Sequence, residues 1–307
     1  MVLKSVHSHK KEDKMGYVFT LLSLFSGLIK GFCGKKISGL VSSIKGTFFM
    51  NMLRMLLCVA VGLVIALADG SSVLGVNPYM LLISAVSGIS TALFVVSWIF
   101  CVRRGAYVMV DVFLMLGGGL TIALCKVFFD EAVTMGQLAG FVLLVIASYV
   151  MCSYSAGIKG GFPFTSFLLL VAGGVCNALA DFSQKWFIYA CPDGKASVFN
   201  LYTYLFGAIV LLISFAIANK AENKPNDGKS LKVFLVICIM AVCLFAYSYF
   251  KTLAAKTVPS AFLYPFTSGA SIVLSGVMAS VFFKEKITVR CAVGIAIALG
   301  AIVIMNM

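Results

Sequence analysis

The chain has 307 residues, of which 61% are hydrophobic and only 11% are charged. A soluble domain carries about a quarter charged residues, so a fold this apolar cannot cover itself with a water-compatible surface and must face lipid. The net charge of +13 raises the question of nucleic acid, but the lysines are scattered over short loops without interleaved aromatics, which argues against that partner.

Residues 1–14 are polar and basic and are predicted to form a disordered tail. Apolar runs of about 20 residues, the length that crosses the hydrocarbon as a helix, then follow one another to the end of the chain. Short connections rich in Gly, Pro, Asp and Lys separate them. The sequence therefore predicts an all-α integral membrane protein with ten transmembrane helices, at residues 16–34, 48–68, 78–100, 106–125, 134–153, 164–190, 198–218, 231–252, 259–282 and 287–306.

An internal repeat aligns residues 127–140, VFFDEAVTMGQLAG, with residues 281–294, VFFKEKITVRCAVG. Shared apolar composition inflates such matches, but it does not explain the pairing of Glu131 with Glu285 and of Thr134 with Thr288. Each repeat holds five spans, and because five is odd the second repeat crosses the membrane in the opposite sense. We therefore predict two inverted five-helix repeats, residues 15–156 and 157–307, an arrangement from which alternating-access carriers are commonly built.

Residues 249–305 carry an A-x-x-x-x-P-S entry at 254–260, a small-residue helix, an E-K-I-T run at 285–288 and a Gly-spaced last helix. This stretch resembles the EamA-like members of the drug/metabolite transporter superfamily. The resemblance implies a ten-helix carrier of metabolites, amino acids or drugs and, in related branches, of nucleotide sugars or phosphorylated sugars. No FYNN-like or GALNK-like stretch of the kind associated with GDP-mannose carriers is present, which weakens the nucleotide-sugar branch.

Candidate pathway residues are the polar and ionisable side chains inside the spans, because their burial in lipid is costly and by default marks a pathway or a pair. In the sixth span Asn177, Asp181, Gln184 and Lys185 share one helical face. They line a cavity with Asp181 as a proton or cation site, or they form a local Asp181–Lys185 pair near the membrane edge.

Arg54 in the second span and Asp111 in the fourth lie at similar depths, so an ion pair between them would relieve two burial costs at once. Such a pair is either a structural bridge or part of a gate, and Asn51 lies one turn before Arg54 on the same face. In the ninth span Tyr264 and Ser268 belong to a small and hydroxyl-bearing face that either packs against another helix or lines a cavity.

Tyr247 shares a face with Lys251 in the eighth span, where cavity lining and snorkelling to the membrane edge are hard to separate. Both histidines, His7 and His9, lie in the tail, so the spans lack histidine-based serine chemistry and the HExxH zinc motif. We expect no enzyme activity, no cofactor and no metal site.

The prediction is a secondary carrier of a small organic solute in the plasma membrane, with proton-coupled export as one form of it. The alternatives are a nucleotide-sugar or phosphorylated-sugar antiporter and, from another class, a membrane scaffold that moves no solute. The expected partners are the solute, protons or a counter-ion, and the lipid bilayer.

Overall fold

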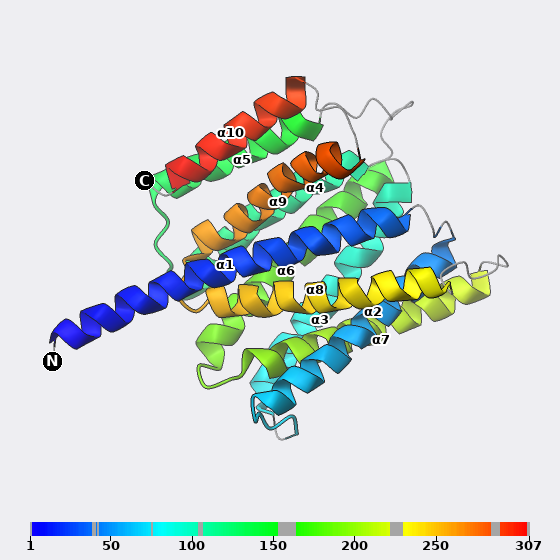
Figure 1. Cartoon of the computed structure of the whole chain (residues 1–307), viewed down its shortest axis with the longest axis horizontal. Helices are drawn as coiled ribbons and strands as arrows, with labels where there is room; N and C mark the ends of the chain where they lie inside the picture. Colours follow the sequence, from blue (N-terminus) through cyan, green and yellow to red (C-terminus); the bar gives the residue numbers. More distant parts are fainter. Residues whose placement is uncertain are drawn as a thin grey trace. The chain divides into compact units, whose positions relative to one another are not determined.

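A computed structural model describes residues 2–38, 41, 43–74, 76–103, 107–152, 164–221, 230–283 and 289–305. Its described backbone is helical, joined by turns and short connections (Figure 1). The helices in chain order are α1 (Val2–Ser38), α2 (Ile44–Ala68), α3 (Pro78–Arg103), α4 (Tyr107–Phe129), α5 (Met135–Cys152), α6 (Phe164–Ala190), α7 (Ala196–Ala221), α8 (Leu231–Ala254), α9 (Ser260–Phe283) and α10 (Val289–Met305).

Every predicted span coincides with one of these helices, and apart from α1 the ends differ by at most a few residues. The exception is the start of the chain, where a disordered tail was predicted for residues 1–14 but the backbone of α1 is helical from Val2. Lysine and glutamate favour helices in water, so a polar segment of this composition can extend an apolar helix beyond the lipid.

The helix ends show why the connections are short. Ser43 caps α2 by accepting a hydrogen bond from the Gly46 amide at 2.9 Å. At the other end Gly70 adopts a φ of +63°, and the amides of Gly70 and Ser71 bond back to the carbonyls of Leu67 and Ala66. This Schellman arrangement needs a residue without a Cβ at Gly70, so the sequence itself stops α2 there.

Six helices are long and apolar enough to cross a membrane, judged by length and composition within the described residues: Lys14–Gly34, Ile44–Ala68, Pro78–Ser97, Phe167–Ala190, Ala196–Ala221 and Leu231–Ala254. Their outer faces carry large apolar side chains that are open to the surroundings, such as Val64 at 66% and Ile217 at 65% exposure. Such apolar surface is unfavourable in water and favourable in lipid. The structure therefore supports an integral, multi-pass membrane protein.

The chain forms two compact units, each built from stretches of both sequence halves. Unit 1 comprises residues 1–88 and 183–263, and in it α1 packs along α8 and α2 packs along α7 (Figure 1). Its apolar contacts include a cluster on α1 and α8 centred on Ile37, Ile237 and Met240. A second cluster includes Phe187 and Phe199, whose rings stack with centroids 4.4 Å apart.

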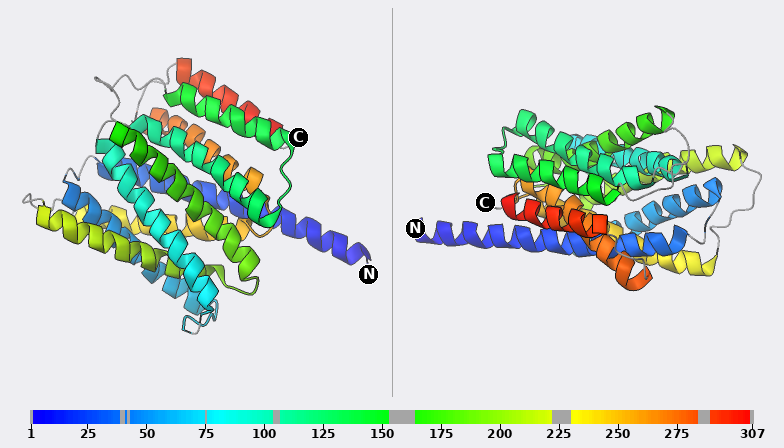
Figure 2. Two further views of the ribbon diagram at one scale, coloured as in Figure 1. Left: turned by 180° about the vertical axis from the view of Figure 1, so that it is seen from behind. Right: turned by 90° about the horizontal axis from the view of Figure 1, so that it is seen from above.

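Unit 2 comprises residues 89–182 and 264–307. Here α5 and α10 lie side by side in every view, and α4 packs against α5 (Figure 1, Figure 2). A Cβ added at Gly140 on α5 would lie 2.8 Å from the Ala301 carbonyl oxygen of α10, so the two backbones approach closely. The boundary at residue 156 separates two repeats along the sequence, whereas the two units are compact groups of helices in space. The boundary between the repeats therefore stays a prediction.

Candidate functional site

The parts of unit 1 that lie in membrane-compatible helices contain basic residues and no acidic ones, although α6, of which only residues 183–190 belong to unit 1, carries Asp181 just before that part. In the sequence, residues 14–34, 44–68, 78–88, 183–190, 196–221 and 231–254 include no Asp or Glu. Lys30, Arg54, Lys185 and Lys251 all lie within these stretches. One Lys or Arg at the centre of a membrane helix costs about 2.5–3.5 kcal/mol to insert, so four of them need a structural or functional reason.

Two of these cations meet at one aromatic ring. The Lys30 ammonium on α1 lies 4.4 Å from the centre of the Tyr247 ring on α8, and the Lys251 ammonium lies 5.2 Å from the same centre. Lys251 also donates a hydrogen bond to the Tyr247 hydroxyl at 3.2 Å and is only 1% exposed. The negative face of the ring stabilises each cation by about 0.5–2 kcal/mol, which offsets part of the burial cost.

Arg54 brings a third cation from α2. At 1.5 Å per residue it lies roughly 15 Å from the start of α2 at Ile44 and roughly 21 Å from its end, too deep for its side chain to be a simple edge residue. Its Nε is buried and has no hydrogen-bond partner among the described residues.

Cys58 lies one turn after Arg54 on α2. Cys58 itself is held in place by a hydrogen bond from its Sγ to the Ala241 carbonyl of α8 at 3.3 Å. We refer to Lys30, Tyr247 and Lys251 as the basic cluster. It draws on α1 and α8, both within unit 1.

A neutral polar network between α7 and α8 lies in the same unit. Ser248 donates to the Asn200 side-chain oxygen, and the Asn200 amide donates to the Thr252 hydroxyl at 3.2 Å. On the next turns of the same two helices, the Tyr204 hydroxyl donates to the Leu244 carbonyl at 3.0 Å. Side chains that satisfy one another inside lipid hold two helices in register, so this network fixes α8, and with it Tyr247 and Lys251.

Lys185, predicted to belong to the pathway, has a structural contact. Its ammonium donates to the carbonyls of Ala255 at 2.8 Å and Val258 at 3.1 Å, directly after α8. The last carbonyls of a helix lack intrahelical partners and carry partial negative charge, so a cation is favourable there. On the same helix Gln184 is buried, and its Oε1 has no hydrogen-bond partner among the described residues.

Four other predicted residues belong to unit 2. Asp181 is 6% exposed, next to Phe182, whose ring contacts Phe128 and Phe129. Asn177 is half-buried one turn earlier on α6. On α9, Tyr264 is fully buried and Ser268 is half-buried. These positions agree with either of the two interpretations given for them, pathway or packing.

Asn51 and Asp111 complete the predicted set. The buried Asn51 amide donates to the Thr47 carbonyl one turn earlier on α2, at 2.8 Å. The side chain of Asp111 lies outside the described residues. The Arg54–Asp111 pair therefore stays a prediction.

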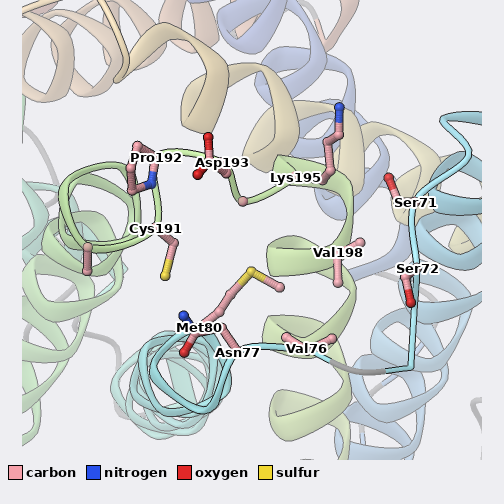
Figure 3. A pocket seen from close by; sticks show the side chains of 12 residues that line it. Ser71, Ser72, Val76, Asn77, Met80, Cys191, Pro192, Asp193, Lys195 and Val198 are labelled. Carbon is pink, nitrogen blue, oxygen red and sulfur yellow. The ribbon is translucent and has the colours of Figure 1, made fainter.

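A separate pocket of about 420 Å³ lies in unit 1 where the connection from α2 to α3 faces the connection from α6 to α7 (Figure 3). Met80 and Cys191 turn their sulfur atoms toward its interior, whereas Asp193 and Lys195 carry their charged ends away from it (Figure 3). Burial raises the pKa of the Cys191 thiol. This pocket is formed by connections and helix ends, whereas the basic cluster lies within the helices.

The sequence reading omitted Lys30 of the basic cluster and the members of the polar network between α7 and α8, which are Asn200, Tyr204, Ser248 and Thr252. Lys30 could have been found, because it is an ionisable residue inside the first apolar run. Asn200 and Ser248 are single polar residues on two different helices, and only their contact across α7 and α8 distinguishes them from helix-packing residues.

The chain resembles known proteins both in sequence and in fold. The sequence model of the EamA-like transporter family matches residues 164–307. A solved structure, described only as the crystal structure of a protein, matches with a TM-score of 0.76 at 14% identity, covering 94% of this chain and 98% of its own. At that identity the match establishes a shared fold alone. No curated protein matches the chain in sequence.

Proposed function

Because residues 164–307 belong to the EamA-like transporter family of the drug/metabolite transporter superfamily, we propose that this membrane transporter is a secondary carrier of a small organic solute working by alternating access. Members of that family are transporters and not enzymes. The observation that carries the proposal is the basic cluster, two cations placed inside apolar helices at one aromatic ring, together with Arg54 deep in α2. Ionisable groups in such a position are typical of a solute pathway.

The packing of the helices supports an inverted repeat. If the second repeat begins at α6, then α2 corresponds to α7 and α5 corresponds to α10. Within unit 1 α2 packs along α7, and within unit 2 α5 packs along α10. A two-fold axis in the membrane plane brings equivalent helices together in this way, so both pairings agree with the proposed symmetry.

The proposed pathway combines the residues predicted from sequence with the basic cluster. From the sequence come Asn51, Arg54, Asp111, Asn177, Asp181, Gln184, Lys185, Tyr247, Tyr264 and Ser268, to which the contacts of Tyr247 add Lys30 and Lys251. Within this set Asp181 is proposed to couple transport to protons or to hold an amine of the solute. The proposed location is the plasma membrane.

The test of the carrier is solute flux in vesicles reconstituted with the purified protein. A first solute is chosen from the metabolites whose levels change when the protein is removed from cells. A carrier gives flux that saturates with solute concentration, a channel gives roughly linear flux and a scaffold gives none. Linear flux, or the absence of flux for every such solute, would contradict the proposal.

The role of Asp181 is tested separately with Asp181→Asn. This variant keeps the size of the side chain and removes its charge. If Asp181 couples transport to protons, the variant reaches the membrane in normal amounts but loses the dependence of flux on the pH gradient. Undiminished pH-dependent flux would show that Asp181 has another role.

A further inference from the structure

We propose that one end of unit 1 binds the headgroups of anionic phospholipids through four lysines, Lys36, Lys45, Lys220 and Lys232, which we call the lysine rim. The inference concerns a lipid partner of the protein and does not depend on the solute. It follows from the way four helix ends come together, from the charge at that end and from the first turns of α2 and α8.

Four helix ends lie on the same side of unit 1. Ile37 near the end of α1 and Val233 near the start of α8 belong to one buried apolar cluster, against which Leu53 of α2 packs. The ring of Phe49 near the start of α2 lies 5.6 Å from the ring of Phe215 near the end of α7. The end of α1, the start of α2, the end of α7 and the start of α8 are therefore neighbours (Figure 1).

Each of these four ends carries a lysine at the boundary of an apolar span. Lys36 follows the span that ends at Gly34, and Lys45 is the second residue of α2. Lys220 is the last residue but one of α7, and Lys232 is the second residue of α8. Lys45 is half-buried, and the other three are exposed. A lysine at the end of a membrane helix extends its ammonium to the level of the lipid headgroups.

The charge at this end of unit 1 is positive. In the sequence, residues 34–47, 215–221 and 230–235 include five lysines and no Asp or Glu. The connection 222–229 contains two acidic and two basic residues, so it adds no net charge. At the opposite ends of the same helices both signs occur, in Lys14, Asp69, Asp193, Lys195 and Lys256. An anionic membrane surface is therefore attracted to the lysine rim more strongly than to the opposite end.

The first turns of α2 and α8 also favour an anion. Lys45 and Lys232 lie where the partial positive charge of a helix start makes a cation unfavourable, and neither first turn contains an acidic residue. Ser230, at the N-cap position of α8, makes no capping hydrogen bond with its side chain. A helix start without a capping side chain and with a lysine beside it suits a phosphate group, which compensates both positive charges.

The surface beside the lysine rim indicates a lipid rather than a free phosphate. Ile217, one turn before Lys220, is 65% exposed, and Leu231 and Leu235, on either side of Lys232, are 73% and 57% exposed. A phospholipid places its anionic headgroup against the lysines and its acyl chains against these apolar side chains. Inorganic phosphate satisfies the lysines alone.

The test measures lipid binding to the full-length protein purified in detergent, by native mass spectrometry. The probes are phosphatidylglycerol and phosphatidylcholine with identical acyl chains, so that only the headgroup charge differs. We expect phosphatidylglycerol to bind about tenfold more tightly than phosphatidylcholine, and added sodium chloride to reduce this preference. Glycerol 3-phosphate, which has an anionic phosphate but no acyl chains, is not expected to compete at equal concentration.

Variants connect that preference to the lysine rim. Lys220→Gln and Lys232→Gln are each expected to weaken phosphatidylglycerol binding roughly fivefold, and the variant with all four lysines changed to Gln should bind both lipids equally. Lys232→Arg keeps the charge and should bind as the wild type does. The matched controls are Lys195→Gln and Lys256→Gln, which make the same change at exposed positions of the opposite end and should keep the preference.

A preference that is lost in the variants of the lysine rim and kept in the two controls would support the inference. Equal binding of both lipids to the wild type, or an equal loss in the control variants, would overturn it, because net charge alone would then account for the binding. Competition by glycerol 3-phosphate at equal concentration would also overturn it, since the bound group would then be a free phosphate. No solute takes part in this measurement, so its outcome is independent of the flux experiment that tests the carrier.

Discussion

The Lys30 ammonium of α1 lies 4.4 Å above the ring of Tyr247 of α8, and it is one of three contacts that join this tyrosine to α1. The Ser23 hydroxyl donates to the Tyr247 carbonyl, and a Cβ added at Gly27 would lie 3.0 Å from the Tyr247 ring. Because Gly27 has no side chain, the Tyr247 ring can pack against the surface of α1, and Lys30 covers the face of that ring. Tyr247 is both a packing residue and the support of the two lysines.

Substitutions at Tyr247 can separate these two roles. Tyr247→Phe keeps the ring face under Lys30 but removes the hydroxyl that accepts from Lys251, so we expect a loss of about 1 kcal/mol of stability. Tyr247→Leu removes the ring as well, which adds the loss of two cation–π contacts, roughly 1–2 kcal/mol each when desolvated. Thermal unfolding in detergent measures the difference, and equal stability of the two variants would show that the ring face contributes nothing.

Gly88 is predicted to tolerate no side chain. A Cβ at this position of α3 would overlap the Thr203 carbonyl oxygen of α7 and lie 3.0 Å from the Gly207 amide nitrogen. Because backbone cannot move aside as a flexible side chain can, Gly88→Ala should destabilise the protein by about 1–3 kcal/mol or prevent its assembly.

The matched control for Gly88→Ala is Gly31→Ala on α1, where an added Cβ meets no atom within 4 Å. In that variant the higher helix propensity of alanine should leave stability unchanged or raise it by up to about 1 kcal/mol. Melting temperatures of both variants check the prediction. A Gly88→Ala protein as stable as Gly31→Ala would show that α3 and α7 are less closely packed than the structure indicates.

Lys185 is predicted to stabilise the fold through its two carbonyl contacts, in addition to its proposed place in the pathway. Lys185→Met keeps a long side chain but removes the ammonium that donates to the Ala255 and Val258 carbonyls. The free energy of unfolding should fall by about 1–3 kcal/mol for each buried acceptor that is left without a donor. We expect a lower melting temperature than that of the wild type. Lys195→Met, at an exposed position, is the control and should melt as the wild type does. An unchanged melting temperature would show that the two carbonyl contacts contribute nothing to stability.

The helices were predictable because the length of an apolar run is set by the thickness of the bilayer. The sixth span was predicted at residues 164–190, and α6 runs from Phe164 to Ala190.

The repeat was also visible in the sequence, but one of its matching residues, Thr134, is explained by local structure. Thr134 caps α5 by accepting from the Gln137 amide, and Gln137 accepts in return from the Thr134 amide, so this threonine is explained by a capping box.

The candidate site was less predictable, because periodicity places residues on a face of one helix but does not say which helix lies opposite. Tyr247 and Lys251 were correctly placed on one face of the eighth span, yet nothing in the spacing indicates that Lys30 of the first span covers the same ring. Lys185 illustrates the converse. Its helical face was predicted, but its partners, Ala255 and Val258, lie in a connection about 70 residues away.

The inverted repeat predicts that two equivalent turns lie on opposite sides of the membrane. The turn after α4 contains Glu131, and the repeat pairs Glu131 with Glu285. Because five helices separate the two positions in the repeat, an odd number of crossings lies between them. Glu131→Cys and Glu285→Cys, each in a background without other cysteines, are therefore expected to label from opposite sides with a membrane-impermeant maleimide.

The measurement compares labelling of intact cells with labelling after permeabilisation. The background must first be shown to fold, because Cys58 donates a hydrogen bond to Ala241 that serine has to replace. We expect one of the two cysteines to react in intact cells and the other only after permeabilisation. If both react under the same condition, the number of crossings between them is even and the repeats are parallel. The pairings of α2 with α7 and of α5 with α10 would then need another explanation, and alternating access through inverted halves would lose its structural basis.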